Sequence, residues 1–405
     1  MKTILETINC TNKKVTISIK KTDQILEAVK AALREPQKFL PLHEPSIGDL
    51  EKQFVNDCIE STFVSSVGKY VDRFEEEIAK YTGAKRAVAV VNGTAALHIS
   101  LLLAGVKQNE EVLVPGLTFV ATANAVSYCG AVPHFVDAEE DSLGIDPSKL
   151  DDYLASISEF AGGCCINKDT GRKISALVPV HIFGHPCKID EILEVTNKYK
   201  LEMVEDAAES LGSFHKGKHT GTLGKLGAIS FNGNKIITTG GGGVILTNDE
   251  TLADYAKYLT TTAKVLHKWE YVHDRVGYNY RMPNLNAALG CAQLNRLPEL
   301  LRSKRDLFGK YQEQISPIDG LRLLSEPPNC SSNYWLQTII LDEANLALRD
   351  EILAILNDAG LMSRPAWTGT HKLKPFKDCP RMKMTTTGSL EKRIINLPSS
   401  SFLNR

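Results

Sequence analysis

The sequence lacks the features that mark several protein classes. No apolar run approaches the roughly 20 residues that a membrane-spanning helix needs, since the longest cover only residues 99–106 and 174–183. The first 21 residues contain no continuous apolar core of a secretory signal. The 47 basic residues are balanced by 48 acidic ones, so net charge favours neither a nucleic-acid nor a membrane partner. We expect a cytoplasmic protein.

The cysteines form no recognisable framework either. There are nine of them, an odd number, and no pair has C-x-x-C spacing. Scattered cysteines in a long chain are typical of reduced, buried thiols. We therefore expect neither a structural metal site nor disulfides.

The composition is that of an ordinary soluble globular protein, with 43% hydrophobic and 23% charged residues. From residue 86 onward, short runs rich in Val, Ile and Phe alternate with helical stretches. Several runs are apolar throughout, which is typical of strands buried on both faces under helices. We expect strands at residues 86–91, 111–115, 133–137, 175–181, 201–205, 227–231 and 242–246.

These patterns predict an α/β fold with a largely parallel sheet, in a chain long enough for two or three domains. Residues 1–40 are predicted to be an N-terminal helical extension, because residues 22–34 have apolar positions at helical spacing. The large domain is expected at 41–290. A smaller α+β domain is expected at 291–405, where two short β-like runs flank a helix at 347–359.

The segment Asn92-Gly93-Thr94-Ala95-Ala96 follows the first predicted strand and opens a helix. Backbone N–H groups at such a turn, together with the helix dipole, favour an anion. The Thr94 hydroxyl could add a donor. The same segment could also be an ordinary strand–helix loop in which Thr94 caps the helix.

Two acidic residues, Glu205 and Asp206, end another buried strand within VEDAAES. Open α/β sheets bind ligands beyond the C-terminal ends of their strands, where Asp206 is expected. A buried carboxylate stays ionised only beside a cation or several hydrogen-bond donors. Alternatively, one of the two acids caps the following helix.

Lys235 follows a third strand, in the turn SFNGNK, and a run of four glycines lies shortly after it. Glycines allow a close approach of the backbone to another group, or a positive φ. A lysine in a turn is usually solvated. At a strand end beside glycines, however, it could be partly desolvated and nucleophilic.

Together the three segments match the needs of pyridoxal 5′-phosphate. The lysine would form a Schiff base with the aldehyde, the carboxylate would keep the ring nitrogen protonated, and the anion site would hold the phosphate. The flat ring also needs an aromatic face, for which Phe119 is the candidate unless it is a core residue. We predict Lys235 and Asp206 as the catalytic residues.

Seven segments of the chain carry a resemblance to a known family: FVSSVGKYVDRFEEEIAKYTGAK, NGTAALH, VPGLTFVATANA, VPVHIFGHP, VEDAAES, SFNGNK and GYNYRMPNLNAA. In this order, from about residue 41 to the C-terminus, they resemble the DegT/DnrJ/EryC1/StrS sugar aminotransferases. The resemblance implies the aspartate aminotransferase-like architecture, PLP-dependent transferase fold type I, with a mixed, mostly parallel seven-stranded sheet. The cofactor-binding residues that it implies are Gly93, Thr94, Ala95, Phe119, Asp206, Glu209, Ser230, Lys235 and Asn279.

Two of these implied positions need comment. Glu209 stands where many relatives have Gln or His beside the ring hydroxyl. Asn279, in GYNYR, stands where the family places an asparagine on the phosphate of the other subunit. The resemblance therefore implies a homodimer with shared active sites.

The resemblance is closest to enzymes that aminate C4 of a nucleotide-linked 4-keto-6-deoxy-N-acetylglucosamine, for legionaminic acid or bacillosamine synthesis. It implies UDP-2-acetamido-4-keto-2,6-dideoxyglucose and L-glutamate as substrates. GDP-linked 4-keto-6-deoxymannose, a perosamine-type substrate, is the nearest alternative. The expected substrate contacts, each of which could instead be structural or solvated, are Lys69, His181, His185, Arg281, Arg364 and His371.

Other classes fit less well. A nicotinamide dehydrogenase would be expected to have G-x-G-x-x-G after the first strand, and the sequence has none there. A non-enzymatic relative would be expected to lose Lys235 or Asp206, and a branch of the family that removes a sugar hydroxyl has His in place of the lysine. Both residues are present, so we predict an active transaminase.

Overall fold

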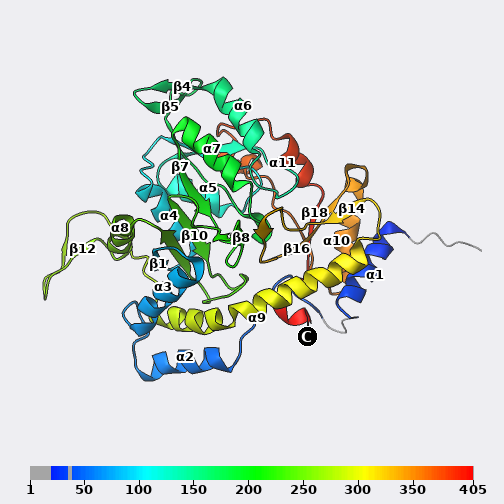
Figure 1. The fold of residues 1–405 in the computed structure, drawn as a ribbon, viewed down its shortest axis with the longest axis horizontal. Coiled ribbons are helices and arrows are strands. Elements are labelled where there is room, and N and C mark those ends of the chain that lie inside the picture. Colours follow the sequence, from blue (N-terminus) through cyan, green and yellow to red (C-terminus); the bar gives the residue numbers. More distant parts are fainter. Residues whose placement is uncertain (1–19, 35–38, 405) are drawn as a thin grey trace, which may run out of the picture.

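A seven-stranded sheet is the centre of the fold in the computed structural model, which describes residues 20–34 and 39–404 (Figure 1). Across the sheet the strands are β1 (Arg86–Val90), β11 (Gly243–Thr247), β10 (Leu226–Ser230), β7 (Glu202–Asp206), β6 (Ile174–Leu177), β2 (Glu111–Pro115) and β3 (Val132–Val136). Strand β11 runs antiparallel to both neighbours, and all other neighbours are parallel. The mixed, mostly parallel sheet is confirmed.

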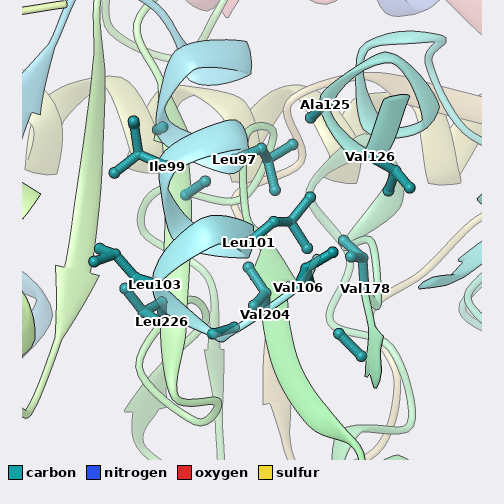
Figure 2. Close-up of a cluster of buried hydrophobic side chains, with 14 of the residues drawn as sticks. Leu97, Ile99, Leu101, Leu103, Val106, Ala125, Val126, Val178, Val204 and Leu226 are labelled. Atoms are coloured by element: carbon teal, nitrogen blue, oxygen red, sulfur yellow. The ribbon is translucent and has the colours of Figure 1, made fainter. Parts of the chain in front are cut away.

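Helices cover both faces of this sheet. Strands β2, β10 and β11 are buried at every position, as their continuous apolar runs predict. One apolar cluster joins the strands to α4 (Gly93–Leu103), α5 (Ala121–Tyr128) and α8 (Glu250–Thr260), and Figure 2 shows part of it around Leu97 and Leu101 of α4. Two further clusters involve α3 (Lys69–Thr82) with α9 (Asn284–Ile315), and α6 (Pro147–Ile157) with α7 (Ile189–Tyr199).

A smaller antiparallel sheet lies beside the C-terminal half of α9. Its strands, in order, are β14 (Leu321–Leu323), β16 (Gln337–Leu341), β18 (Ile394–Leu397) and β17 (Arg364–Pro365). Helices α1 (Lys21–Ala32) and α10 (Arg349–Asp358) share an apolar cluster with it and with the end of α9. The helix expected at 22–34 therefore packs onto the small sheet. Residues 1–19 and 35–38 of the predicted extension lie outside the described residues.

The predicted domain boundary at residue 290 falls inside α9. This helix packs its first half under the large sheet and its second half against the small one. The division at residues 40 and 290 stays a prediction. Helix α2 (Asp49–Glu60) lies along the first half of α9 in Figure 1.

Three hairpins have no counterpart in the sequence prediction: β4 (Ser158–Ala161) with β5 (Cys164–Asn167), β8 (Phe214–His215) with β9 (Lys218–His219), and β12 (Lys264–Val265) with β13 (Val272–His273). Both strands of the β12–β13 hairpin are largely exposed, so no burial pattern marks them. The strand expected at 175–181 is shorter: regular pairing ends at Leu177, Val180 keeps one isolated bridge to Asp206, and Phe183 then takes a positive φ of 55°.

Membrane-spanning helices, metal-binding clusters and disulfides are absent from the described residues, 20–34 and 39–404. None of the helices in these residues is long and apolar enough to span a membrane. No group of three or more His, Cys, Asp or Glu side chains in this part of the chain is arranged to hold a metal ion. The eight cysteines between residues 39 and 404 are free thiols.

Buried His185 should make stability depend on pH. Its ring is fully buried, with Nδ1 3.0 Å from Ser332 Oγ. Burial, and to a lesser degree Arg322, lowers the pKa of His185 from 6.5 to about 3. Below pH 6.5 the unfolded chain therefore takes up a proton that the folded chain refuses. We expect this residue alone to reduce the free energy of unfolding by roughly 1–2 kcal/mol between about pH 6.5 and pH 5.

Denaturant unfolding of the cofactor-loaded protein at both pH values measures this effect. His185→Gln removes the titrating group, so its unfolding free energy should fall less over the same interval by about that amount. The same fall in both proteins would contradict the assignment.

Candidate active site

Strands β1, β7 and β10 end at one cavity of about 350 Å³. Residues from distant parts of the sequence line this cavity, from Asn92 near the first strand to Trp367 near the C-terminus. Of the nine predicted cofactor-binding residues, the following seven line it: Gly93, Thr94, Phe119, Asp206, Glu209, Ser230 and Lys235. Ala95 and Asn279 do not.

The N-terminus of α4 forms the predicted anion site. Asn92 is the N-cap, because its Oδ1 accepts the N–H of Ala95 at 2.7 Å. This corrects two expectations: Thr94 is not the cap, and the N–H of Ala95 is already used. Among the described residues, none accepts the N–H of Gly93 or Thr94, which leaves both donors available at the positive end of the helix dipole.

Glycine is required at position 93 because the chain is crowded there. A Cβ atom would lie 2.8 Å from the Cβ of Ser230. Across the sheet, a Cβ on Gly243 would lie 2.7 Å from the backbone nitrogen of Gly93. Gly240 takes a positive φ of 78°. The glycine run therefore serves both purposes predicted for it, a close backbone approach and a left-handed turn.

Asp206 lies at the end of β7 and is only 5% exposed. Its carboxylate accepts hydrogen bonds from Thr122 Oγ1 at 2.7 Å and from the N–H of Ala208 at 3.1 Å. Burial raises its pKa, although these two hydrogen bonds oppose the shift. A cationic partner in the cavity would stabilise the ionised form of this carboxylate.

Lys235 reaches the same cavity from the turn after β10. Its Nζ lies 3.4 Å from Glu209 Oε1 and 3.9 Å from the centre of the Trp335 ring. The other oxygen of Glu209 accepts the N–H of Phe183 at 2.9 Å. Burial raises the pKa of Glu209, while the nearby Lys235 opposes this. The lysine is thus held by a carboxylate and an aromatic face.

Phe119 lines the cavity with 54% of its surface exposed. It is therefore not a core residue. Its ring centre is 6.4 Å from that of Trp367, and its exposed surface is available to a flat ligand.

Glu205, which precedes Asp206 in VEDAAES, has a structural role rather than a capping one. Glu205 is fully buried and accepts the N–H groups of Gly221, Leu223 and Gly224 at 2.6–2.8 Å. It also pairs with His181 Nε2 at 3.0 Å. The carboxylate therefore holds a loop beside β7. The helix expected after this strand is not formed, and residues 207–213 are turns and irregular chain.

Arg364, one of the predicted substrate contacts, lies beside the cofactor cavity. It lines an adjoining cavity of about 500 Å³. The two cavities share Asn234, Trp335 and Trp367. In the described part of the chain, no ion pair or hydrogen bond engages the side chain of Arg364, and it is exposed.

The other predicted contacts line neither cavity. Lys69 is exposed at the start of α3 and pairs with Asp57 at 2.8 Å. Arg281 forms an isolated backbone bridge with Val90, and its buried Nε has no partner among the described residues. Asn279 is exposed and bridges to Thr261 at the base of the β12–β13 hairpin.

The three histidines are buried structural residues in this arrangement. Both ring nitrogens of His181 are engaged, by Glu205 and by the N–H of Cys187. Burial disfavours its charged form, but Cys187 and Glu205 raise the pKa of His181 to about 10. His185 bonds to Ser332, and His371 is 6% exposed beside Phe135.

Several residues of the cavity wall were not identified from the sequence, among them Thr122, Asn234, Trp335 and Trp367. Thr122 had a usable signal, since a hydroxyl one helical turn after Phe119 can face the same ligand. The two tryptophans follow from the position of the small sheet, and no local pattern marks them.

The cavity fits pyridoxal phosphate by the chemistry of its groups. The two unpartnered N–H groups of α4 and the Ser230 hydroxyl suit a phosphate. Asp206, a buried carboxylate with no ion pair to another described residue, suits a protonated ring nitrogen. Lys235 would supply the amine for the aldehyde.

Comparisons with known proteins identify the family. A model of the DegT/DnrJ/EryC1/StrS aminotransferase family matches residues 45–405. The chain is 35% identical over 362 residues to GDP-perosamine synthase of Escherichia coli O157:H7, covering 89% of this chain and 93% of the relative. It is 34% identical over 330 residues to the spore coat polysaccharide biosynthesis protein SpsC of Bacillus subtilis (strain 168), covering 79% and 80%.

A solved structure is also similar. The aminotransferase TlmJ from Streptoalloteichus hindustanus matches with a TM-score of 0.80 and 26% identity, covering 89% of this chain and 93% of that chain. The chain belongs to the DegT/DnrJ/EryC1/StrS aminotransferase family and is a pyridoxal phosphate-dependent sugar transaminase.

Proposed function

We propose that the protein transfers the amino group of L-glutamate to C4 of a nucleotide-linked 4-keto-6-deoxy sugar. The observation that carries this proposal is the pair of joined cavities. Lys235 and Asp206 line the first, and the unpaired cation Arg364 lines the second. One cavity provides for the amine chemistry, and the other provides room and charge for a large anionic substrate.

Each group in the first cavity has a role in this scheme. When bound, the cofactor supplies a protonated ring that stabilises negative charge on the carbon next to the transferred nitrogen. Asp206 would hold the proton on the ring nitrogen. Lys235 Nζ would hold and move a proton at the substrate carbon. Glu209 would orient Lys235 and contact the ring hydroxyl.

The second cavity suits the nucleotide-sugar. Arg364 would bind the pyrophosphate, since a guanidinium binds phosphate oxygens in a bidentate manner. Trp335 and Trp367 line both cavities and would pack against the sugar between them. Lys69 and Arg281 line neither cavity, so we propose that they act at the site of a neighbouring subunit.

A homodimer with shared sites is part of the proposal. The hairpin at residues 262–276 projects from the body of the molecule (Figure 1). It exposes large apolar side chains, with Leu266 98% and Val276 85% exposed. Exposed apolar patches of this kind mark interaction surfaces. Asn279 at its base would then reach the phosphate in the partner's cavity.

The nucleotide carrier has two candidates. The resemblance of several segments favours a UDP-linked 2-acetamido sugar, as used for legionaminic acid or bacillosamine. Three relatives, each 35–36% identical, are named GDP-perosamine synthase, which favours GDP-linked 4-keto-6-deoxymannose equally. Either substrate, with glutamate, would agree with a cytoplasmic enzyme.

We expect the enzyme to discriminate between these two sugars by at least about 100-fold in kcat/KM. A pocket that hydrogen-bonds the acetamido group at C2 leaves buried polar groups unpaired when a hydroxyl takes its place, and the reverse also holds. Steady-state assays of both sugars with L-glutamate measure the ratio. Comparable use of both would contradict a dedicated C2 pocket, and no amination of either would contradict the proposed substrate class.

A further inference from the structure

A second set of chemically active side chains lies away from the cofactor site. Asp190, His215 and Cys330 line a surface cavity of about 540 Å³. This cavity shares no lining residue with the cofactor cavity or with its neighbour. Its size is in the range of small-molecule sites. Nothing in the transamination scheme uses these three residues.

Strand pairing fixes the relation of the thiol to the imidazole. Strand β8 (Phe214–His215) pairs antiparallel with β15 (Cys330–Ser331), and Cys330 lies directly opposite His215. On one side of this pair, the N–H of Lys216 donates to the carbonyl of Asn329 at 2.8 Å. The two side chains are therefore held together by backbone hydrogen bonds rather than by a flexible loop.

The three side chains form a relay. Cys330 Sγ lies 3.4 Å from His215 Nδ1, and His215 Nε2 lies 2.9 Å from Asp190 Oδ2. Lys216 Nζ also contacts Asp190 Oδ2, at 2.6 Å. Lys216 and His215 lower the pKa of Asp190. An ionised Asp190 accepts a hydrogen bond from the N–H at Nε2 of His215. Nδ1 of the same ring is then unprotonated and can accept the thiol proton.

In this arrangement Cys330 is placed as the nucleophile, His215 as the base, and Asp190 as the carboxylate that orients the base. Burial, then Cys187 and the nearby acids, raises the pKa of the Cys330 thiol to about 11. The resting form is therefore the neutral thiol. Such a thiol reacts readily only when a neighbouring base removes its proton during attack, and His215 is placed to do so.

We propose that Cys330 is a site of thiol–disulfide exchange with a small zwitterionic disulfide of the glutathione kind. The side chains around it carry both signs of charge, as such a molecule does: Lys188, Lys216, Arg322, Asp141, Asp190, Glu191 and Glu326. As Sγ attacks one sulfur, His215 takes the thiol proton. A new S–S bond forms, the old one breaks, and the departing thiolate takes the proton from His215.

The test uses the cofactor-loaded protein and glutathione disulfide as the probe. Peptide mass spectrometry after an acid quench gives the rate of mixed-disulfide formation at each cysteine. Cys129 and Cys379 are matched controls, because they are also partly buried but, in the described chain, have no histidine ring nitrogen as a hydrogen-bond partner. The thiol of Cys129 donates only to the backbone carbonyls of His98 and Ala125. We expect Cys330 to react at least about tenfold faster than either of them.

Two variants distinguish an effect of the relay on the reactivity of Cys330 from an effect of solvent exposure alone. His215→Gln and Asp190→Asn should each slow the reaction at Cys330 by about tenfold or more, while leaving Cys129 and Cys379 unchanged. In denaturant all cysteines should react alike, which checks that the native difference comes from the fold. Equal native rates at the three cysteines, or no slowing in a variant that keeps the cofactor absorbance of the parent, would overturn the proposal.

Discussion

Lys235→Ala should bind pyridoxal phosphate without a covalent link and lose turnover by at least about 10³-fold. The amine of Lys235 is the one lysine Nζ that lines the cofactor cavity in the described chain. Without it, the cavity has no lysine amine to bond to the aldehyde or to move the proton between the substrate carbon and the cofactor. The loss should appear in kcat rather than only in KM, because binding groups remain.

Borohydride reduction of the loaded protein, followed by peptide mass spectrometry, locates the covalent link. The parent should carry the cofactor on Lys235, and the variant should carry none. Lys225→Ala is the matched control, since Lys225 is a surface lysine paired with Glu202 at 3.0 Å. A reduced cofactor on any other lysine would contradict the assignment.

Mixing two inactive variants should restore activity. Lys235→Ala lacks the amine, and Asn279→Ala lacks the amide that we expect on the partner's phosphate. After subunit exchange, a mixed dimer has one site with both residues intact. Random pairing makes half of the dimers mixed, so about a quarter of the parent activity should return.

The reason for this expectation is the position of Asn279. It is exposed and lines neither cavity of its own subunit, although the resemblance assigns it to the cofactor phosphate. Each variant alone, taken through the same exchange protocol, is the control. No recovery on mixing, or full activity of a stable monomer, would contradict shared sites.

The cofactor site could be predicted from the sequence because its groups stand at strand ends. Asp206 directly ends a buried apolar run, and Ser230 and Lys235 end or closely follow another. Parallel strands bring such ends to one edge of the sheet, so local patterns were enough to place the residues together. The helix cap was mistaken because Asn92 and Thr94 are both good capping residues, and only the backbone geometry distinguishes them.

The substrate side was harder to predict. Trp335 and Trp367 enter the cavity wall through the packing of the small sheet against the large one, which no local pattern encodes. The histidines were expected as substrate contacts because the segments that contain them resemble the family. In the structure, His181 Nε2 donates to the buried Glu205, and His185 is a neutral core residue.

The central claim is amine transfer to a nucleotide-linked sugar, and a single-turnover experiment tests it most directly. The loaded protein is treated with ¹⁵N-labelled L-glutamate and freed of excess amino acid. It is then mixed with the UDP-linked acetamido sugar or the GDP-linked 4-keto-6-deoxymannose. We predict that one of them gains a single ¹⁵N-amino group at C4, in an amount close to that of the active sites. Formation of 2-oxoglutarate without labelled amino sugar from either substrate would contradict the account.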